Sequence, residues 1–252
     1  GLAEDRATSI EIHADGWQSV YVAEPLAPGF APPDLAAWFT QQMKWARGVF
    51  ELLVMVYPRL VGNLKLGQKI SYAVRMTYYW IGPVVALHLL ATVLVLWLGS
   101  ETAVRNFEHY LLHLVPLAIA AAGIRQLALR RWRHRSLSPN LQIKPMLLVY
   151  VTWPIYTMAW LMALLRVPLS FRATPKQSNG NVKFRWLLPQ ILTLALVIAG
   201  AVRNWALFVD AQAWLTICFV SLQIYTHIVL LARWLPMVLS KAKRFQIVEE
   251  SS

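Results

Sequence analysis

The sequence predicts a mostly α-helical protein that crosses a membrane several times. Its 252 residues are 58% hydrophobic and 14% charged, whereas soluble domains average roughly 45–50% apolar and about 25% charged residues. A bilayer crossing requires about 20 consecutive, mostly apolar residues. Four stretches meet this requirement, at 80–99, 107–124, 186–209 and 213–235. This composition excludes an ordinary soluble globular protein, and its high apolar and aromatic content excludes a disordered chain.

Charged residues divide the chain into two parts. Seven of the 12 Asp and Glu residues fall within the first 51 residues. Between residues 52 and 248 the acids are Glu101, Glu108 and Asp210, against 21 Lys and Arg residues. We therefore expect residues 1–40 to be the end of a soluble domain and the remainder to be a hydrophobic body with basic margins. Because the sequence begins with Gly and shows no signal peptide, we also expect it to be the C-terminal part of a longer protein.

The distribution of cations predicts which apolar segments cross the membrane. Residues 145–165 are also long and apolar, but Lys and Arg residues without any acid flank them on both sides. Short loops rich in these cations stay cytoplasmic, so both flanks belong on the same side. Pro145, Pro154 and Pro168 favour a broken helix at the membrane interface. We therefore predict an interfacial helix over 141–167, with a fifth crossing as the alternative.

A first amphipathic interfacial helix is predicted ahead of the spans, within residues 41–63. Apolar residues recur at spacings of three and four between Gln41 and Tyr57, the pattern of a helix that lies along a surface. Tyr57 precedes Pro58, and the residue before a proline is disfavoured in helical geometry. We therefore expect this helix to end at Tyr57, with the membrane domain following over 64–252.

Four crossings give a consistent distribution of charge. The three acids of the membrane half then fall on the outer side, while the basic C-terminal tail and the loop at 168–185 fall on the cytoplasmic side. Tryptophans cluster near the span ends, as aromatic residues do at membrane interfaces. The net charge of +12 would favour nucleic acid binding in a soluble protein. Here the Arg-rich segment 130–135 lies beside a span, so topology and anionic lipid explain it better.

Three short motifs could carry chemistry. They are Ala3-Glu4-Asp5, the segment Gln41-Gln42-Met43-Lys44-Trp45-Ala46-Arg47-Gly48, and the segment Phe171-Arg172-Ala173-Thr174-Pro175-Lys176. Each has a purely structural interpretation when taken alone. The first is typical of an acidic helix N-terminus, the second of cationic and aromatic contacts with lipid headgroups, and the third of a basic loop with a proline turn.

Together and in this order, the motifs resemble those of the membrane-embedded processive glycosyltransferases of family 2, of which the bacterial cellulose synthase catalytic subunit is the best-known member. That family carries Thr-Glu-Asp, then Gln-x-x-Arg-Trp on an interfacial helix and two spans. A second interfacial helix, a gating loop of the form Phe-x-Val-Thr-x-Lys and two more spans follow. This chain shows Ala-Glu-Asp, Gln-x-x-Lys-Trp and Phe-x-x-Thr-x-Lys at the corresponding places. The resemblance implies that residues 1–40 end a GT-A-like α/β catalytic domain.

The resemblance also implies a role for the residues of the first two motifs. Asp5 would be the general base that accepts the proton of the acceptor hydroxyl, with Glu4 as a supporting carboxylate. Lys44 would stabilise the departing nucleotide diphosphate. It stands where the family has Arg, and it offers a point charge instead of a bidentate fork. Gln41 and Trp45 would contact the terminal sugar of the acceptor.

The third motif would form a gating loop that closes over bound nucleotide and excludes water. Its implied functional residues are Phe171, Thr174 and Lys176. Mg²⁺ or Mn²⁺ is implied for the intact enzyme, but the chain contains no Asp-x-Asp pair, so no metal ligand is assigned to it. We therefore expect the fragment alone to be inactive, because the half that binds donor and metal lies upstream.

The implied reaction is the inverting extension of a β-linked polysaccharide from a nucleotide sugar, expected to be a UDP-sugar, with translocation of the product across the bacterial inner membrane. The expected partners are therefore the donor, the growing polysaccharide, the lipid bilayer and an outer-side accessory subunit, and not nucleic acid. A non-processive family-2 transferase acting on a lipid-linked acceptor is one alternative. A non-catalytic transport or scaffold subunit is another, although it would not account for the three motifs.

The remaining polar candidates are histidines and one cysteine. His109 and His113 share a helical face and could suit a metal, but no third ligand is in register, so ordinary interfacial histidines are preferred. His88 and His227 lie within spans, where polar groups can mark a pathway. Helix packing is the preferred interpretation there. Cys218 is the only cysteine, which excludes a disulfide within the chain.

Overall fold

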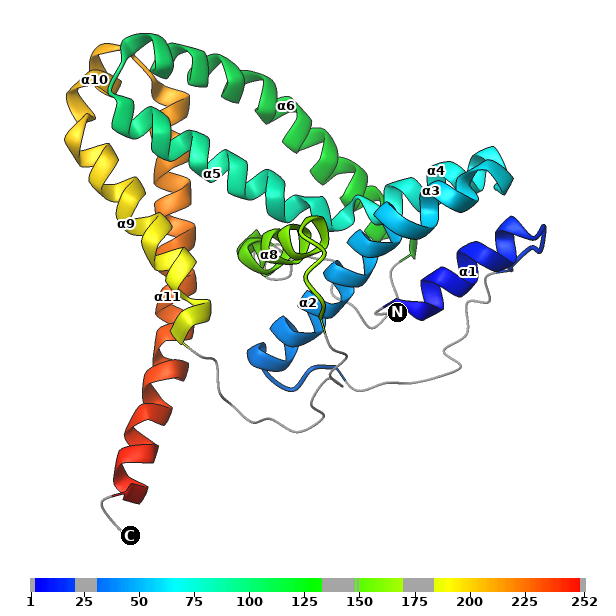
Figure 1. Cartoon of the computed structure of the whole chain (residues 1–252). Helices are drawn as coiled ribbons and strands as arrows, with labels where there is room; N and C mark the ends of the chain where they lie inside the picture. Colours follow the sequence, from blue (N-terminus) through cyan, green and yellow to red (C-terminus); the bar gives the residue numbers. More distant parts are fainter. Residues whose placement is uncertain (1–2, 21–30, 133–147, 149, 170–183, 250–252) are drawn as a thin grey trace. The chain divides into compact units, whose positions relative to one another are not determined.

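The computed structural model describes residues 3–20, 31–132, 148, 150–169 and 184–249 (Figure 1). The regular structure in these ranges is helical throughout, as the sequence predicts. The chain divides into two compact units. Unit 1 comprises residues 1–86 and 150–183, and unit 2 comprises residues 87–149 and 184–252.

Unit 1 contains the first two motifs and the helices around them. Its elements are α1 (Glu4–Ala14), α2 (Leu35–Glu51), the π-helical stretch η1 (Leu52–Val56), α3 (Tyr57–Leu60), the 3₁₀ turn η2 (Val61–Asn63), α4 (Leu66–Met76), the 3₁₀ turn η3 (Tyr78–Trp80), the first residues of α5 (Ile81–Leu98) and α8 (Trp153–Leu164). The part of residues 1–40 that the structure describes forms α1 and the beginning of α2. An α/β catalytic domain upstream of them therefore stays a prediction.

Unit 2 contains most of the apolar helices. It holds the remainder of α5, α6 (Glu101–Trp132), the 3₁₀ turn η4 (Phe184–Trp186), α9 (Leu188–Arg203), α10 (Trp205–Asp210) and α11 (Trp214–Glu249). α9 packs along α11, and α6 also contacts α11 (Figure 1).

Helix α2 begins six residues before the predicted helix. Asp34 caps it, because the Asp34 Oδ1 atom accepts a hydrogen bond of 2.8 Å from the backbone N–H of Ala37. Such a cap satisfies one of the backbone donors that a helix N-terminus leaves without a partner. The apolar spacing that begins at Gln41 therefore marks only the later part of a longer helix.

The predicted end of this helix at Tyr57 is wrong. Tyr57 has helical backbone angles (φ −57°, ψ −42°), and Pro58 stands in the first turn of α3. The π-helical turns of η1 lie just upstream and change the hydrogen-bond register of the backbone. The missing N–H of Pro58 consequently falls at the start of a new helical segment, where no intrahelical partner is required.

Among the residues that the structure describes, three helices are long and apolar enough to cross a membrane: Leu66–Leu98, Glu101–Leu127 and Trp214–Ala232. They contain or largely overlap the predicted spans at 80–99, 107–124 and 213–235.

The predicted span at 186–209 is not one continuous helix. Its helix α9 has 16 residues, so it is about 24 Å long at about 1.5 Å per residue. The helix breaks at Asn204 (φ −116°, ψ 25°), whose Nδ2 atom donates a hydrogen bond of 2.6 Å to the carbonyl oxygen of Leu96. This side-chain bond holds the break in place, and α10 follows as a separate short helix. A count of four spans is therefore not established.

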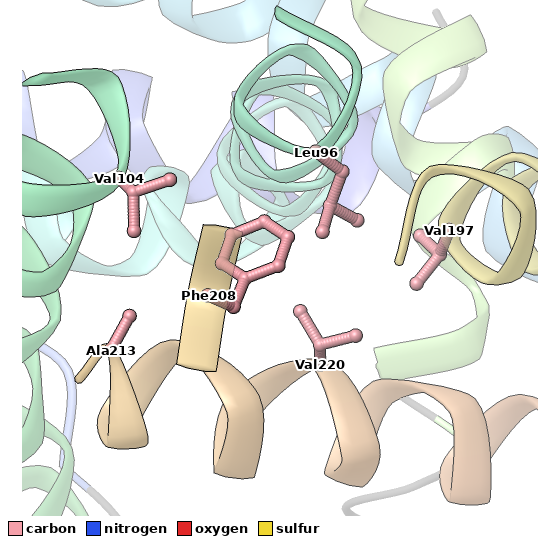
Figure 2. Packing of buried hydrophobic residues seen from close by; sticks show 6 residues of the cluster. All are labelled: Leu96, Val104, Val197, Phe208, Ala213 and Val220. Atoms are coloured by element: carbon pink, nitrogen blue, oxygen red, sulfur yellow. The ribbon is translucent and has the colours of Figure 1, made fainter. Parts of the chain in front are cut away.

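A buried apolar cluster unites the helices of unit 2 around Phe208 (Figure 2). Its members are Leu96, Val104, Val197, Phe208, Ala213 and Val220. Phe208 comes from α10 and is only 2% exposed. Burying a side chain of this kind contributes about 2–3 kcal/mol. α10 is therefore held by its own contact with the core as well as by the chain segments that join it to α9 and α11.

Helix α8 packs across α2 within unit 1, and its residues Ile155, Tyr156 and Ala159 are buried. Its 12 residues extend about 18 Å, less than the roughly 30 Å of a hydrocarbon core. α8 alone is therefore too short to span. Residues 133–147 and 149 lie outside the described ranges, so the interfacial location of 141–167 stays a prediction.

Candidate functional site

The Gln-x-x-Lys-Trp motif lies in the middle of α2. Gln41, Lys44 and Trp45 are separated by three and four residues, a spacing that gathers side chains on one side of a helix. The side chain of Trp45 is 48% exposed, that of Gln41 is half-buried and Lys44 is only 9% exposed. The motif thus combines an accessible aromatic ring with a cation that is largely removed from water.

The burial of Lys44 changes its electrostatics. Desolvation lowers the pKa of the Lys44 ammonium below its ordinary value. A desolvated cation interacts strongly with an anion that reaches it, because little water screens the attraction. The chemistry that this residue supports best is the stabilisation of a negatively charged group at the edge of α2.

Gln42, which follows Gln41 in α2, faces α8. Its Oε1 atom accepts a hydrogen bond of 2.8 Å from the hydroxyl of Tyr156. Both side chains are buried, with Gln42 at 3% and Tyr156 at 0% exposure. Burial and the neighbouring phenols of Tyr78 and Tyr79 raise the pKa of Tyr156, so its hydroxyl remains a neutral donor.

Arg47 lies one turn beyond Lys44, and a guanidinium there could in principle replace the Arg of the family motif. The structure gives it another role. Its Nη2 atom donates a hydrogen bond of 3.1 Å to the carbonyl oxygen of Val167, and its Nη1 atom lies 3.4 Å from the Glu51 carboxylate. Arg47 is 5% exposed, so it ties α2 to the chain segment after α8.

The acid pair occupies the first turn of α1. Glu4 and Asp5 are both exposed, and the Asp5 Oδ1 atom accepts a hydrogen bond of 2.9 Å from the backbone N–H of Arg6. Acids in a first turn interact favourably with the helix dipole. The structure therefore agrees with the interpretation of this motif as an acidic helix N-terminus. The role of Asp5 as a general base stays a prediction.

Two sets of contacts place α1 within unit 1. The His13 Nδ1 atom lies 2.7 Å from the Tyr72 hydroxyl, which joins the end of α1 to α4. Helix α1 also contacts α3. The ring of Tyr79 packs edge-on against Phe50 of α2, with ring centroids 6.4 Å apart. The acid pair and the α2 motif therefore belong to one packed unit.

The implied gating-loop residues Phe171, Thr174 and Lys176 lie outside the described residues, and their predicted roles stay predictions. No group of three or more His, Cys, Asp or Glu side chains in the described ranges could hold a metal ion. Divalent cations such as Mg²⁺ take several oxygen ligands. The described part of the chain therefore does not fit a metal site by itself, and the implied ion would depend on residues elsewhere.

The histidines in the apolar helices make local contacts. His88 Nδ1 lies 3.0 Å from the Tyr110 hydroxyl, and its ring packs edge-on against Phe219 at 4.7 Å. His227 Nδ1 is hydrogen-bonded to the Gln223 carbonyl oxygen at 2.8 Å. His113 contacts His109 in the same way, through a hydrogen bond of 2.8 Å from ring to carbonyl oxygen. The contacts of His88 and His227 agree with the packing interpretation, while the interfacial interpretation of His109 and His113 stays a prediction.

Sequence reasoning missed Gln42, Arg47 and Tyr156 as residues that determine the position of the motif. A signal was present for Gln42, because it is a polar residue at helical spacing from the apolar positions Phe39 and Ala46. The sequence gives no comparable signal for Tyr156, which is 114 residues away from its partner.

Comparison with known proteins finds one family whose model matches most of the chain, including the first two motifs. A family model described as cellulose synthase matches residues 1–168, two thirds of the 252-residue chain. The chain is 31% identical over 123 residues to the cellulose synthase 1 catalytic subunit [UDP-forming] of Komagataeibacter xylinus, covering 49% of this chain and 15% of that protein.

Two further relatives have similar names. The chain is 30% identical over 137 residues to the cellulose synthase catalytic subunit [UDP-forming] of Pseudomonas fluorescens (strain SBW25), covering 53% of this chain and 18% of the relative. It is 23% identical over 181 residues to cellulose synthase 2 of Novacetimonas hansenii, covering 72% and 10%. The chain therefore spans less than a fifth of the length of each of these relatives.

No solved structure matches the chain. The matched residues 1–168 include the acid pair at the start of α1, the whole of α2 with its Gln-x-x-Lys-Trp motif, and α8, which packs against it. The chain belongs to the cellulose synthase family.

Proposed function

We propose that this chain is the C-terminal part of an inverting family-2 glycosyltransferase that elongates a β-linked polysaccharide from a UDP-sugar. The observation that carries this proposal is the exposed indole of Trp45 beside the buried ammonium of Lys44, in a segment matched by the cellulose synthase family. Two relatives are named as UDP-forming, which supports UDP as the leaving nucleotide.

The proposed chemical step is a single displacement. As the acceptor hydroxyl oxygen attacks the anomeric carbon of the donor, Asp5 accepts the hydroxyl proton. The new C–O bond forms on the face opposite the diphosphate, and the bond to the diphosphate oxygen breaks. UDP leaves with that electron pair, so the configuration at the anomeric carbon inverts. Glu4 supports Asp5 from the neighbouring position.

Lys44 has the charge and the setting to assist departure of UDP. Negative charge grows on the diphosphate as its bond to the sugar breaks, and a preorganised cation stabilises that charge. Lys44 is buried, and desolvation lowers its pKa, so a diphosphate that approaches it would stabilise the charged ammonium. This attraction would grow as negative charge develops on the diphosphate in the transition state.

The acceptor end of the site is assigned to α2. The half-exposed ring of Trp45 offers a flat apolar face for the terminal sugar, and Gln41 on the same side offers hydrogen bonds. Phe171, Thr174 and Lys176 would form the loop that closes over nucleotide. A divalent ion, Mg²⁺ or Mn²⁺, would supply further neutralisation of phosphate charge in the complete enzyme.

The apolar helices support a membrane location for the complete protein. In our proposal the protein lies in the bacterial inner membrane, with the motifs and the C-terminus on the cytoplasmic side. The growing polysaccharide crosses the membrane domain, and an accessory subunit on the outer side would receive it. The chain alone is inactive in this proposal, because the upstream half would supply the donor site.

Sugar transfer by the complete protein, reconstituted in membranes with radiolabelled UDP-glucose, tests the proposal. We expect insoluble product that a β-glucanase degrades. Asp5→Asn should abolish transfer while donor binding is retained, and Trp45→Ala should weaken acceptor use more than donor binding. Asp15→Asn and Trp17→Ala are matched controls, because both residues are exposed and lie outside the motifs.

Three results would contradict parts of this proposal. Turnover by Asp5→Asn at the rate of Asp15→Asn would remove Asp5 from the base role. A labelled lipid in place of a polymer would favour the non-processive alternative. Absence of transfer from any nucleotide sugar would favour a transport or scaffold role.

A further inference from the structure

We propose that the buried hydrogen bond between Gln42 and Tyr156 is a latch that sets the rotation of α2 and thereby positions Lys44 and Trp45 for transfer. Both residues are positioning residues in this inference, since neither is assigned a contact with substrate. The inference rests on the proposed function for its catalytic consequence. The latch itself rests only on the structure.

The geometry of the pair leaves little freedom. The Tyr156 hydroxyl donates to the Gln42 Oε1 atom at 2.8 Å, and both side chains are at most 3% exposed. A buried amide or phenol without its partner destabilises the arrangement that leaves it so, because water cannot replace the lost bond. Rotating α2 away from α8 would incur this cost, so the hydrogen bond favours one rotational setting over its neighbours.

Tyr156 is held in place because the start of α5 packs closely against α8 at this residue. Gly82 at the start of α5 meets α8 so closely that a Cβ atom there would lie 2.8 Å from the Thr157 backbone nitrogen and 3.0 Å from the Trp153 carbonyl oxygen. The Tyr156 ring packs against the Tyr79 ring, with centroids 5.1 Å apart. A hydroxyl carried by such a residue cannot follow a rotation of α2.

A second bond restrains the same helix further along. Arg47 donates from its Nη2 atom to the carbonyl oxygen of Val167, just after the end of α8, at 3.1 Å. The two bonds leave α2 at different points along its length and meet the segment 156–167 at both ends. Two anchors separated along the axis resist rotation and tilt, which one anchor alone cannot do.

Small rotations of α2 would matter for transfer. Successive residues turn by about 100°, so Gln42 lies about 60° from Trp45 and about 160° from Lys44 around the axis. Side-chain ends stand roughly 5–6 Å from a helix axis, so a rotation of about 10° moves them by about 1 Å. A misplacement of about 1 Å can reduce a rate on the order of 10²-fold. A latch on one side of α2 can therefore control residues on its other sides.

The test compares two hydroxyl deletions in α8 of the complete protein. Tyr156→Phe removes the latch hydroxyl and retains the ring. Thr157→Val is the matched control, because the Thr157 hydroxyl donates only to the Trp153 carbonyl oxygen within α8. We expect kcat to fall about ten-fold or more in Tyr156→Phe with an unchanged KM for UDP-glucose, and no such change in Thr157→Val.

A double variant separates positioning from stability. In Gln42→Met with Tyr156→Phe both polar groups of the buried Gln42–Tyr156 bond are removed together, so the unfolding midpoint should return towards that of the wild type. The kcat should stay low because no bond sets the rotation of α2. Recovery of kcat together with stability would overturn the positioning role, and so would a Tyr156→Phe variant with the kcat of Thr157→Val.

Backbone amide exchange provides a measurement that does not need activity. Amides of residues 41–50 should exchange faster in Tyr156→Phe than in the wild type or Thr157→Val. Equal exchange in all three proteins would overturn the latch even if sugar transfer is observed. Conversely, absence of sugar transfer by the wild type, together with faster exchange in Tyr156→Phe, would contradict the proposed function and leave the latch intact.

Discussion

The side chain of Glu108 in α6 caps the N-terminus of another helix, α11, at Thr216. Its Oε1 atom accepts a hydrogen bond of 2.8 Å from the backbone N–H of Leu215. Its Oε2 atom accepts bonds of 2.8 Å and 2.6 Å from the backbone N–H and the hydroxyl of Thr216. A carboxylate at this position satisfies two helix donors and interacts with the positive end of the helix dipole.

Replacing Glu108 should therefore destabilise unit 2. Glu108→Ala should lower the free energy of unfolding by about 1–2 kcal/mol, as the loss of a helix cap does. Thermal unfolding in a fixed detergent or nanodisc would measure the change. Glu101→Ala is the control, because Glu101 forms an exposed ion pair with Arg105 of the kind that contributes little. Equal effects of the two substitutions would contradict the capping role.

Lys44 predicts a stability that depends on pH. Its pKa in the folded protein is lowered from 10.5 by desolvation, so the unfolded chain binds the proton more tightly. The desolvation cost is fully present below the folded pKa and disappears as pH rises through the window up to 10.5, so stability increases across that window. Lys44→Met should raise the unfolding midpoint at neutral pH, with a smaller gain at alkaline pH. Arg59→Met, which removes an exposed cation, should show no such gain.

The contact between His13 and Tyr72 should hold α1 on α4. A double-mutant cycle with His13→Ala and Tyr72→Phe should give a coupling free energy on the order of 0.5–1.5 kcal/mol, the usual net value of a hydrogen bond. Amide exchange of α1 should rise in both single variants. Ser9→Ala should leave α1 protected, because the Ser9 hydroxyl bonds only within its own helix. Additive effects of the two substitutions would show that the contact does not hold α1.

Two glycines in apolar helices should respond differently to alanine. A Cβ at Gly200 would lie 2.8 Å from the Leu96 Cβ atom, whereas nothing lies within 4 Å of a Cβ at Gly123. Gly200→Ala should cost about 1–3 kcal/mol because it separates α9 from α5. Gly123→Ala should be neutral or slightly stabilising. The ratio of folded to aggregated protein after heating would compare them, and equal losses would contradict the close approach at Gly200.

Membrane topology gives a prediction for segments beyond the described residues. In a Cys218→Ser background, cysteines introduced at Ser138 and Ser178 should react with an impermeant reagent from the same side of the membrane. This result is expected because both positions flank the interfacial helix with basic residues and no acid. Reaction from opposite sides would establish a crossing between them and replace the interfacial prediction for 141–167.

The helices and their membrane character could be predicted from the sequence because both depend on neighbouring residues. Hydropathy is a local sum, so the apolar runs ending at Gly99 and near Leu235 are visible without a fold. The three motifs are local as well, and their order was enough to indicate a family. The same local reasoning failed at Pro58, since the π-helical turns before it change the backbone register that the rule assumes.

Tertiary structure alone decided which polar side chains meet. Gln42 and Tyr156 are 114 residues apart, and Glu108 and Thr216 are 108 apart. A hydrogen bond requires two atoms to approach within about 3 Å in one orientation, and no periodicity in the sequence encodes that approach. The sequence thus determined the helical, strongly apolar character of the protein and its motifs. Packing between distant helices decided that Lys44 is buried, that Trp45 is exposed and that α2 is fixed by α8.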